Sequence, residues 1–337
     1  MKKKLFAGIC LALGITTLAG CSQASQKLQF NTNWSLNTMN DTPISTAEVL
    51  TYDVNFVASS FMQGEHFSVE YCKDIDGKTQ LGSYVTTLEG KDGGYLYTTT
   101  LSVPVRYSFG GETAVFTDTM TSVVEFKSAK HGLTPISSTK TVISHSPRNV
   151  EPTSLSGCYV DYRYTLTTTY NSDCTAGETL MIDNSENGTL YNKDIYPSGK
   201  KGSFEIDITK YSYLDNEQLL FALRGLSNTA ISTTKSVNVY NASLDMVQLV
   251  TMTPSSSDSD KYGFTINGTK LADDVAIDYT PVTIALPKGA TQTLHYASTT
   301  DDANNIYRNV LLYMRTPVAY NIGYLEYTLK DAVFANS

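Results

Sequence analysis

The feature that most constrains this chain is the alternation of apolar and polar residues from Glu48 onward. Twelve or more runs rich in Thr, Val and Tyr alternate with period two, which is typical of half-buried antiparallel strands. Clear examples are VLTYDVNFVASSF, YLYTTTLSVPVRYSF, CYVDYRYTLTTTY and YLEYTLKDA. Turn signals such as GKDGG, FGGE and PSGKKG separate the runs. The pattern predicts a mainly β fold with a large antiparallel sheet, half-barrel or barrel-like, with a sandwich as the alternative.

Two segments break this pattern and predict short helices. In DNEQLLFALRGL, near 215–225, Asp215 is placed as the N-cap and Gln218 completes a capping box. Its leucines share one face, so we expect this helix to plug the concave face of the sheet. The second segment, DDANNIYRNVLLYMRTP, has Ile306, Val310 and Met314 at steps of four and Pro317 as a stop.

The first twenty residues are typical of an export signal. Lys2, Lys3 and Lys4 precede the apolar run LFAGICLALGITTL, which is too short for a membrane span. Leu18-Ala19-Gly20-Cys21 then resembles the lipobox of bacterial lipoproteins. The resemblance implies that residues 1–20 are removed, that the Cys21 sulfur carries diacylglycerol, and that the new amino group is usually acylated. Two or three acyl chains suffice for stable anchoring, so we expect a lipid-anchored protein at a cell membrane, facing outside the cytoplasm.

The charge balance is acidic. The formal net charge is −8, and removal of three signal lysines leaves 22 basic against 33 acidic residues, about −11. Such a chain offers no basic patch for nucleic acid, so nucleic acid is not an expected partner. The expected attachment to the membrane is through the lipid on Cys21 alone.

The chain divides into candidate regions after the signal. Residues 21–46 are rich in Ser, Asn, Thr and Gln and are predicted to form a polar tether. The segment HSPRNVEPTSLSG separates a first β region at 47–144 from a second at 155–335. The two regions are either separate domains or one continuous curved sheet, and the sequence leaves this open.

Three cysteines remain after Cys10 is removed and Cys21 is lipidated. Cys72, Cys158 and Cys174 are odd in number, and a straight strand would hold the last two roughly 40 Å apart. We therefore predict free, mostly buried thiols, and the spacings match no zinc pattern.

Two stretches carry a further resemblance. VVEFKSAKHGLTPISSTKTV and DNEQLLFALRGL are similar to segments of bacterial envelope proteins with a LolA-like curved β-sheet. The resemblance implies an open sheet around a helix and a cavity for an amphiphile, and it transfers no binding residue.

Signatures of catalysis are missing from the sequence. There is no G-x-S-x-G elbow and no H-E-x-x-H pair, and both Ser-x-x-Lys spacings, at Ser137 and Ser232, fall in strand-like runs. We predict no catalytic residue and no cofactor. Paired carboxylates from distant positions, as in glycoside hydrolases, remain an alternative.

One pattern resembles a calcium loop. In DNSENGTLYNKD, Asp183, Ser185, Asn187 and Asp194 fall at positions 1, 3, 5 and 12 of an EF-hand-like loop. Position 12 has Asp in place of the usual Glu. A β-hairpin that turns at Asn187-Gly188 accounts for the same residues, and we favour it and predict no metal.

Tyrosine is unusually frequent, with 23 residues against one Trp. Tyr159, Tyr162 and Tyr164 are therefore the candidate binding residues, since an exposed row of rings stacks on sugars. The alternative is that these rings are buried with their hydroxyls at the rim. The chain is thus expected to be a non-catalytic binding module for an amphiphile or an envelope glycan. The alternatives are an envelope glycan hydrolase and a structural or assembly protein.

Overall fold

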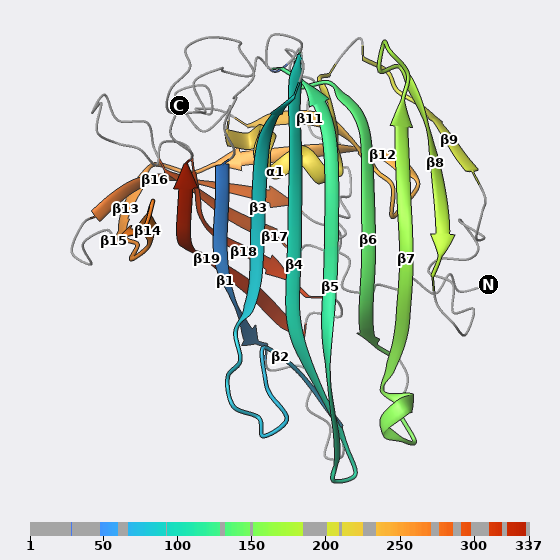
Figure 1. The fold of residues 1–337 in the computed structure, drawn as a ribbon, viewed down its shortest axis with the longest axis vertical. Helices are drawn as coiled ribbons and strands as arrows, with labels where there is room; N and C mark the ends of the chain where they lie inside the picture. The colour runs from blue at the N-terminus through green and yellow to red at the C-terminus, as the bar shows by residue number, and fades with distance from the viewer. Residues whose placement is uncertain are drawn as a thin grey trace.

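The computed structural model describes residues 28, 48–59, 67–91, 93–128, 132–148, 151–184, 201–208, 211–224, 234–270, 276–285, 291–297, 310–318 and 322–334. As predicted, the fold is mainly β, with one short α-helix among the described residues. The strands form one large sheet (Figure 1), and two of the described pairings, β10–β11 and β14–β19, are parallel while the others are antiparallel. Residues 1–27, which include Cys21, lie outside the described ranges.

The N-terminal half of the chain forms a first wall of long, neighbouring strands. Its pairing order is β9-β8-β7-β6-β5-β4-β3-β1, and β2 pairs with the far end of β4. The strands are β1 (Glu48–Ala58), β2 (Phe67–Tyr71), β3 (Gly82–Lys91), β4 (Gly94–Phe109), β5 (Glu112–Lys127), β6 (Pro135–Pro147), β7 (Tyr159–Tyr170), β8 (Ala176–Asp183) and β9 (Lys201–Glu205).

The C-terminal half forms a second wall. Its pairing order is β19-β18-β17-β16, after which β16 pairs with both β12 and β13, and β12 leads through β11 to β10. The strands are β10 (Tyr213–Asp215), β11 (Lys235–Asn241), β12 (Met246–Pro254), β13 (Asp258–Lys261), β14 (Thr265–Ile266), β15 (Thr269–Lys270), β16 (Ala276–Ala285), β17 (Thr291–Ala297), β18 (Leu311–Pro317) and β19 (Gly323–Phe334).

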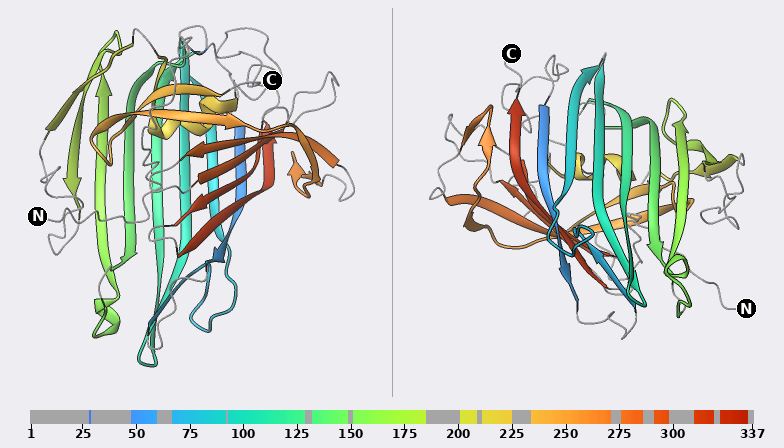
Figure 2. Two further views of the ribbon diagram at one scale, coloured as in Figure 1. Left: turned by 180° about the vertical axis from the view of Figure 1, so that it is seen from behind. Right: turned by 60° about the horizontal axis from the view of Figure 1, so that its bottom comes forward.

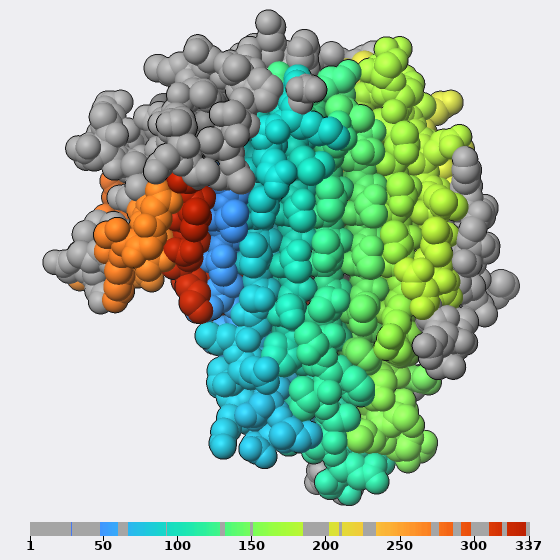
Figure 3. Space-filling view, viewed as in Figure 1, coloured from blue at the N-terminus to red at the C-terminus, as the bar shows by residue number. Residues whose placement is uncertain are grey.

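The pairing of β1 with β19 joins the two walls. The register runs from Glu48↔Phe334 to Ala58↔Gly323, with one irregularity between Thr51 and Tyr52. The second wall then crosses behind the long strands (Figures 1 and 2). No described pairing connects the end strands β9 and β10, so the sheet is not closed. Figure 3 shows the outer face of the first wall, where β19, β1, β3 and the strands that follow β3 lie side by side.

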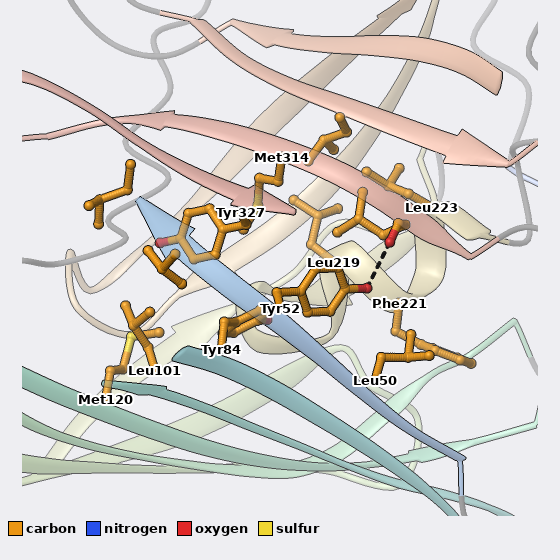
Figure 4. Close-up of a cluster of buried hydrophobic side chains, with 14 of the residues drawn as sticks. Leu50, Tyr52, Tyr84, Leu101, Met120, Leu219, Phe221, Leu223, Met314 and Tyr327 are labelled. Atoms are coloured by element: carbon orange, nitrogen blue, oxygen red, sulfur yellow. Dashed lines mark hydrogen bonds between the residues drawn. The ribbon is translucent and has the colours of Figure 1, made fainter. Parts of the chain in front are cut away.

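The helix α1 (Leu219–Arg224) lies between the walls, as the leucine pattern predicts. Asp215 and Gln218 form the expected capping box around a 3-10 turn, Asn216–Gln218, that precedes α1. Leu219, Phe221 and Leu223 are at most 1 % exposed, and Figure 4 shows side chains of both walls meeting around them. Each such side chain contributes about 1.5–3 kcal/mol by burial.

The second predicted helix is wrong where the structure describes it. Val310 and the strand β18 that follows it are extended, while residues 301–309 lie outside the described ranges. Leu312 and Met314 are buried while Tyr313 and Arg315 are partly exposed, so the burial has period two. Pairing with β17 and β19 on both sides outweighs the helical spacing of Val310 and Met314.

The sheet continues through the boundary at 145–157. Strands β6 and β7 pair from Ser137↔Thr169 to Pro147↔Tyr159, so the two β regions share a sheet. Buried residues of both regions also belong to one core cluster.

The described cysteines behave as predicted. Cys72, Cys158 and Cys174 are free and buried. Burial raises the pKa of the Cys72 thiol to about 11 and that of Cys174 to about 12, so both remain protonated and unreactive near neutral pH. Among the described residues, no helix is long and apolar enough to cross a membrane.

Candidate functional site

A row of aromatic rings lies on the outer face of the second wall. Leu294 and Met314 point into the core, so their neighbours His295 and Tyr313 point outward. The His295 ring stacks on Tyr279, with centroids 4.3 Å apart and planes 15° apart. On its other side Tyr313 follows at 4.9 Å. We call Tyr279, His295 and Tyr313 the outer aromatic row; it crosses the adjacent strands β16, β17 and β18.

A neighbouring segment holds the row in place. Tyr262, which follows β13, packs edge-on against Tyr279 at 5.9 Å. Its hydroxyl shares a hydrogen bond of 2.9 Å with His295 Nδ1. Burial lowers the pKa of His295, and Asp260 and Asp258 offset this only in part. The imidazole is therefore neutral near pH 7 and presents a flat, uncharged ring.

Polar groups flank the row on β18 and β19. Arg315 lies over the Tyr324 ring, with Cζ 4.1 Å from its centroid. Arg315 Nε is 3.7 Å from Glu326 Oε1, and both side chains are partly exposed, at 40 % and 25 %. Burial, followed by a hydrogen bond to Glu326, raises the pKa of Tyr313, so its hydroxyl stays protonated. At this end of the outer aromatic row, a guanidinium and a carboxylate thus lie beside the rings of Tyr313 and Tyr324.

Two carboxylates lie at the other end of the row. Asp258 and Asp260 are exposed on the edge strand β13, and the Tyr279 hydroxyl donates to Asp258 Oδ2 at 3.3 Å. Residues two apart on a strand point to the same side. Tyr279 is only 6 % exposed and belongs to the core cluster, so the ring faces open to a ligand are those of the partly exposed His295 and Tyr313. Exposed flat rings with hydrogen-bonding groups beside them are suited to pack on the apolar face of a sugar and bind its hydroxyls.

A second aromatic cluster surrounds His145 on the first wall. The His145 ring stacks on Phe116 at 4.0 Å with planes 12° apart, and Tyr159 contacts both rings. His145 Nδ1 lies 2.8 Å from Asp118 Oδ1, which also accepts the His145 backbone N–H. Burial raises the pKa of Asp118, and its bonds to His145 offset this in part. Because His145 is only 7 % exposed, this pair serves packing better than catalysis.

A third polar cluster joins α1 to the first wall. Asp215 accepts hydrogen bonds from Ser138 Oγ at 2.7 Å and from the Tyr170 hydroxyl. Glu217 pairs with Lys140 Nζ at 3.1 Å. Asp215 is only 2 % exposed, and all these bonds are within the fold. These two neighbouring carboxylates therefore hold the capped helix in place and are not open to a substrate.

The predicted tyrosines have different surroundings. Tyr162 and Tyr164 are 4 % and 1 % exposed and belong to the core, so neither presents a ring face to a ligand. Tyr159 is partly buried against Phe116 and His145, and its role in binding stays a prediction.

The calcium-loop residues are described only in part. Asp183 ends β8, where it pairs in register with Tyr164. Ser185, Asn187 and Asp194, and the second arm of the expected hairpin, lie outside the described residues. On the side of β8 opposite β7, the described partner is β9, with Leu180 opposite Lys201. In the part of the chain that the structure describes, no three His, Cys, Asp or Glu residues are grouped to hold a metal ion.

The outer aromatic row was missed by sequence reasoning. Its members are 16 and 18 residues apart and become neighbours only when β16, β17 and β18 pair. The available signal was one aromatic or histidine at an outward position in each of DYTPVTI, TLHYA and LYMR. It went unused because β17 was not predicted as a strand and β18 was assigned to a helix.

Comparison with known proteins gives a likeness in fold only. No protein-family model and no curated protein matches the chain. A solved structure, a beta-barrel-like protein of domain of unknown function DUF1849 from Brucella abortus, is 10 % identical with a TM-score of 0.47. The match covers 88 % of this chain and 100 % of that one. At that level of similarity no function and no residue role is transferred.

Proposed function

We propose that this chain is a lipid-anchored protein of the bacterial envelope whose β domain binds an envelope glycan without catalysing a reaction. The lipidated residue is Cys21, and the protein faces outside the cytoplasm. The ligand class is a saccharide with an accessible apolar ring face.

The observation that carries the proposal is the outer aromatic row. Tyr313 and His295 are partly exposed on adjacent strands, and their rings lie 4.9 Å apart. A rigid sheet holds them, so little conformational entropy is lost when a ligand stacks on them. Arg315, two residues after Tyr313 on β18, and its cross-strand neighbour Glu326 are partly exposed on the same face of the sheet.

A glycan is favoured over an amphiphile as the ligand because side chains fill the described space between the two walls. An acyl chain needs an apolar cavity, but the described side chains between the walls are in contact with one another around α1 (Figure 4). Six tyrosines of this described core cluster, among them Tyr52, Tyr107 and Tyr327, are less than 2 % exposed and fill the space.

The test of glycan binding is co-sedimentation with insoluble envelope polysaccharide. We expect Tyr313→Ala to weaken binding roughly two- to tenfold, since one aromatic contact contributes about 0.5–1.5 kcal/mol. Tyr159→Ala is the matched control, because it removes a partly buried tyrosine from the other aromatic cluster. If Tyr313→Ala binds the polysaccharide as well as the original protein and Tyr159→Ala binds it less, the binding site lies at the His145 cluster instead.

A glycan hydrolase is the second candidate. It is favoured by Asp258 and Asp260, two exposed carboxylates beside the row. A hydrolase would release soluble sugar from the same polysaccharide, and Asp258→Asn or Asp260→Asn would abolish release while leaving sedimentation intact. We expect no release from the unmodified protein.

The anchor is tested separately. Cys21→Ala should leave the chain unprocessed or release it from the membrane fraction, because the lipid is its only predicted attachment. If the variant is cleaved and still fractionates with membranes, the lipobox interpretation is wrong.

A further inference from the structure

The beginning of the chain contacts the open edge of the sheet. The Leu28 backbone N–H donates to Ser212 Oγ at 2.9 Å, and Ser212 Oγ donates to the Leu28 carbonyl at 3.3 Å. The Leu28 side chain packs against the core cluster. Three contacts therefore fix Leu28 on the domain, within the segment for which the composition predicts a tether.

Ser212 lies near the end of the first wall at which β7 finishes. It directly precedes β10, and its carbonyl accepts from the Asn238 N–H at 2.9 Å. The next residue, Tyr213, contacts the ring of Tyr170, the last residue of β7, at 5.8 Å. We call Ser212, Tyr213 and the turn 171–175 the seam end.

The hairpin between β4 and β5 lies at the opposite end (Figure 1). Strand β5 runs from Glu112 at that hairpin to Lys127, whose Nζ donates to the Ser172 carbonyl in the seam end at 3.1 Å. Sixteen residues of strand span about 50 Å. The two ends of the first wall are therefore separated by about that distance.

The length of chain before Leu28 limits how far the seam end can lie from the anchor. Seven residues lead from Cys21 to Leu28, and a fully extended chain spans at most about 3.3–3.6 Å per residue, or about 25 Å. A free tether through residue 46 would allow more than three times that reach. Because Leu28 is docked, the tether between Cys21 and the domain consists of the residues before Leu28 and not of all residues up to 46.

We propose that the seam end faces the lipid bilayer, with the β4–β5 hairpin pointing away from it. The proposal rests on lipidation of Cys21, as in the proposed function. The acidic chain is not attracted to anionic headgroups, so the orientation depends on the docked Leu28 and not on charge.

Energy transfer to the membrane surface tests this orientation. The full lipidated protein is placed in vesicles, and Asp173→Cys and Glu112→Cys each carry a donor dye. Both positions are exposed acids, one in the seam end and one at the hairpin, and the described native cysteines are buried. Acceptor lipids lie in the outer leaflet. We expect roughly twofold or higher transfer from position 173, because the heights differ by up to about 50 Å.

The docking contact is tested by a further substitution. Ser212→Ala removes the hydroxyl that bonds Leu28, and we expect the difference between the two dyes to shrink. Ser236→Ala is the matched control, since it removes a hydroxyl bond between Ser236 on β11 and Thr251 on β12, and it should keep the difference.

Each outcome is decisive. Equal transfer from both dyes on membrane-bound protein, or higher transfer from position 112, overturns the orientation and leaves the anchor standing. Failure of the protein to float with vesicles refutes the anchor and the orientation together, and glycan co-sedimentation is unaffected by either result.

Discussion

Replacing Glu48 by Gln should destabilise the fold by about 3–5 kcal/mol, because it removes the carboxylate charge to which two nitrogens of the buried Arg224 guanidinium donate. Arg224 Nη1 and Nη2 donate to the two Glu48 carboxylate oxygens at 2.5 and 3.0 Å. The side chains are 4 % and 9 % exposed. Burial alone lowers the pKa of Arg224, but Glu48, together with Tyr52 and Tyr97, outweighs it and raises that pKa, so the guanidinium stays charged.

The measurement is urea or thermal unfolding followed by circular dichroism. A loss of 3–5 kcal/mol corresponds to a fall in Tm of about 5–8 °C for a chain of this size. Glu125→Gln is the matched control: it breaks the ion pair with Lys91, in which Lys91 is 50 % and Glu125 27 % exposed, and it should cost less than about 1 kcal/mol. The double variant Glu48→Leu/Arg224→Met should recover most of the loss, since apolar replacements remove both charges.

The reasoning is refuted by a Glu48→Gln protein within about 1 kcal/mol of the original. Such a result would mean that the remaining contacts of Arg224 compensate its charge, and that the Glu48 carboxylate contributes little to holding α1 between the walls.

Three further predictions concern the core, the polar cluster and the calcium motif. Leu219→Asp should unfold the domain, because an unpaired carboxylate would replace a side chain that is 0 % exposed; unchanged Tm would contradict this. Burial, with Glu217 beside it, raises the pKa of Asp215 to about 6 from 3.8, so its stabilising protonated form is fully present below about pH 4 and is lost as pH rises through 6. The unfolding free energy relative to Asp215→Asn should therefore rise by about 2–3 kcal/mol between pH 7 and 4, and a flat difference would refute the shift. Calcium at about millimolar concentration should not raise Tm, and Asp183→Ala should be mild; calcium stabilisation that Asp183→Ala abolishes would overturn this.

Local signals were sufficient for much of the fold. The alternation in CYVDYRYTLTTTY predicts a strand, and β7 covers Tyr159–Tyr170. The capping box at Asp215 and Gln218 forms as its spacing predicts. Both features depend on neighbours in sequence, which is why they can be read without a structure.

Other features depend on partners far along the chain. Met314 and Val310 have helical spacing, but β17 and β19 enclose β18 and make it a central strand. The 16-residue β5 begins at Glu112, well before the predicted run at Thr121, because β4 pairs along its whole length.

The candidate site was less accessible still. The alternation places Tyr162 and Tyr164 on the same face of a strand, but it does not tell whether that face is buried or exposed. Which face meets the core is decided by the packing of the second wall. The outer aromatic row comes from strands β16, β17 and β18, and only their register brings Tyr279, His295 and Tyr313 together.

Histidine ring NMR during titration with solubilised envelope glycan tests the central claim most directly. The chain has four histidines, and two of them mark the two aromatic clusters. The account predicts that the His295 ring signals shift with added glycan while those of His145 stay unchanged, and that Tyr313→Ala reduces the His295 shift. A shift of His145 without His295, or no shift of either at saturating glycan, would contradict it.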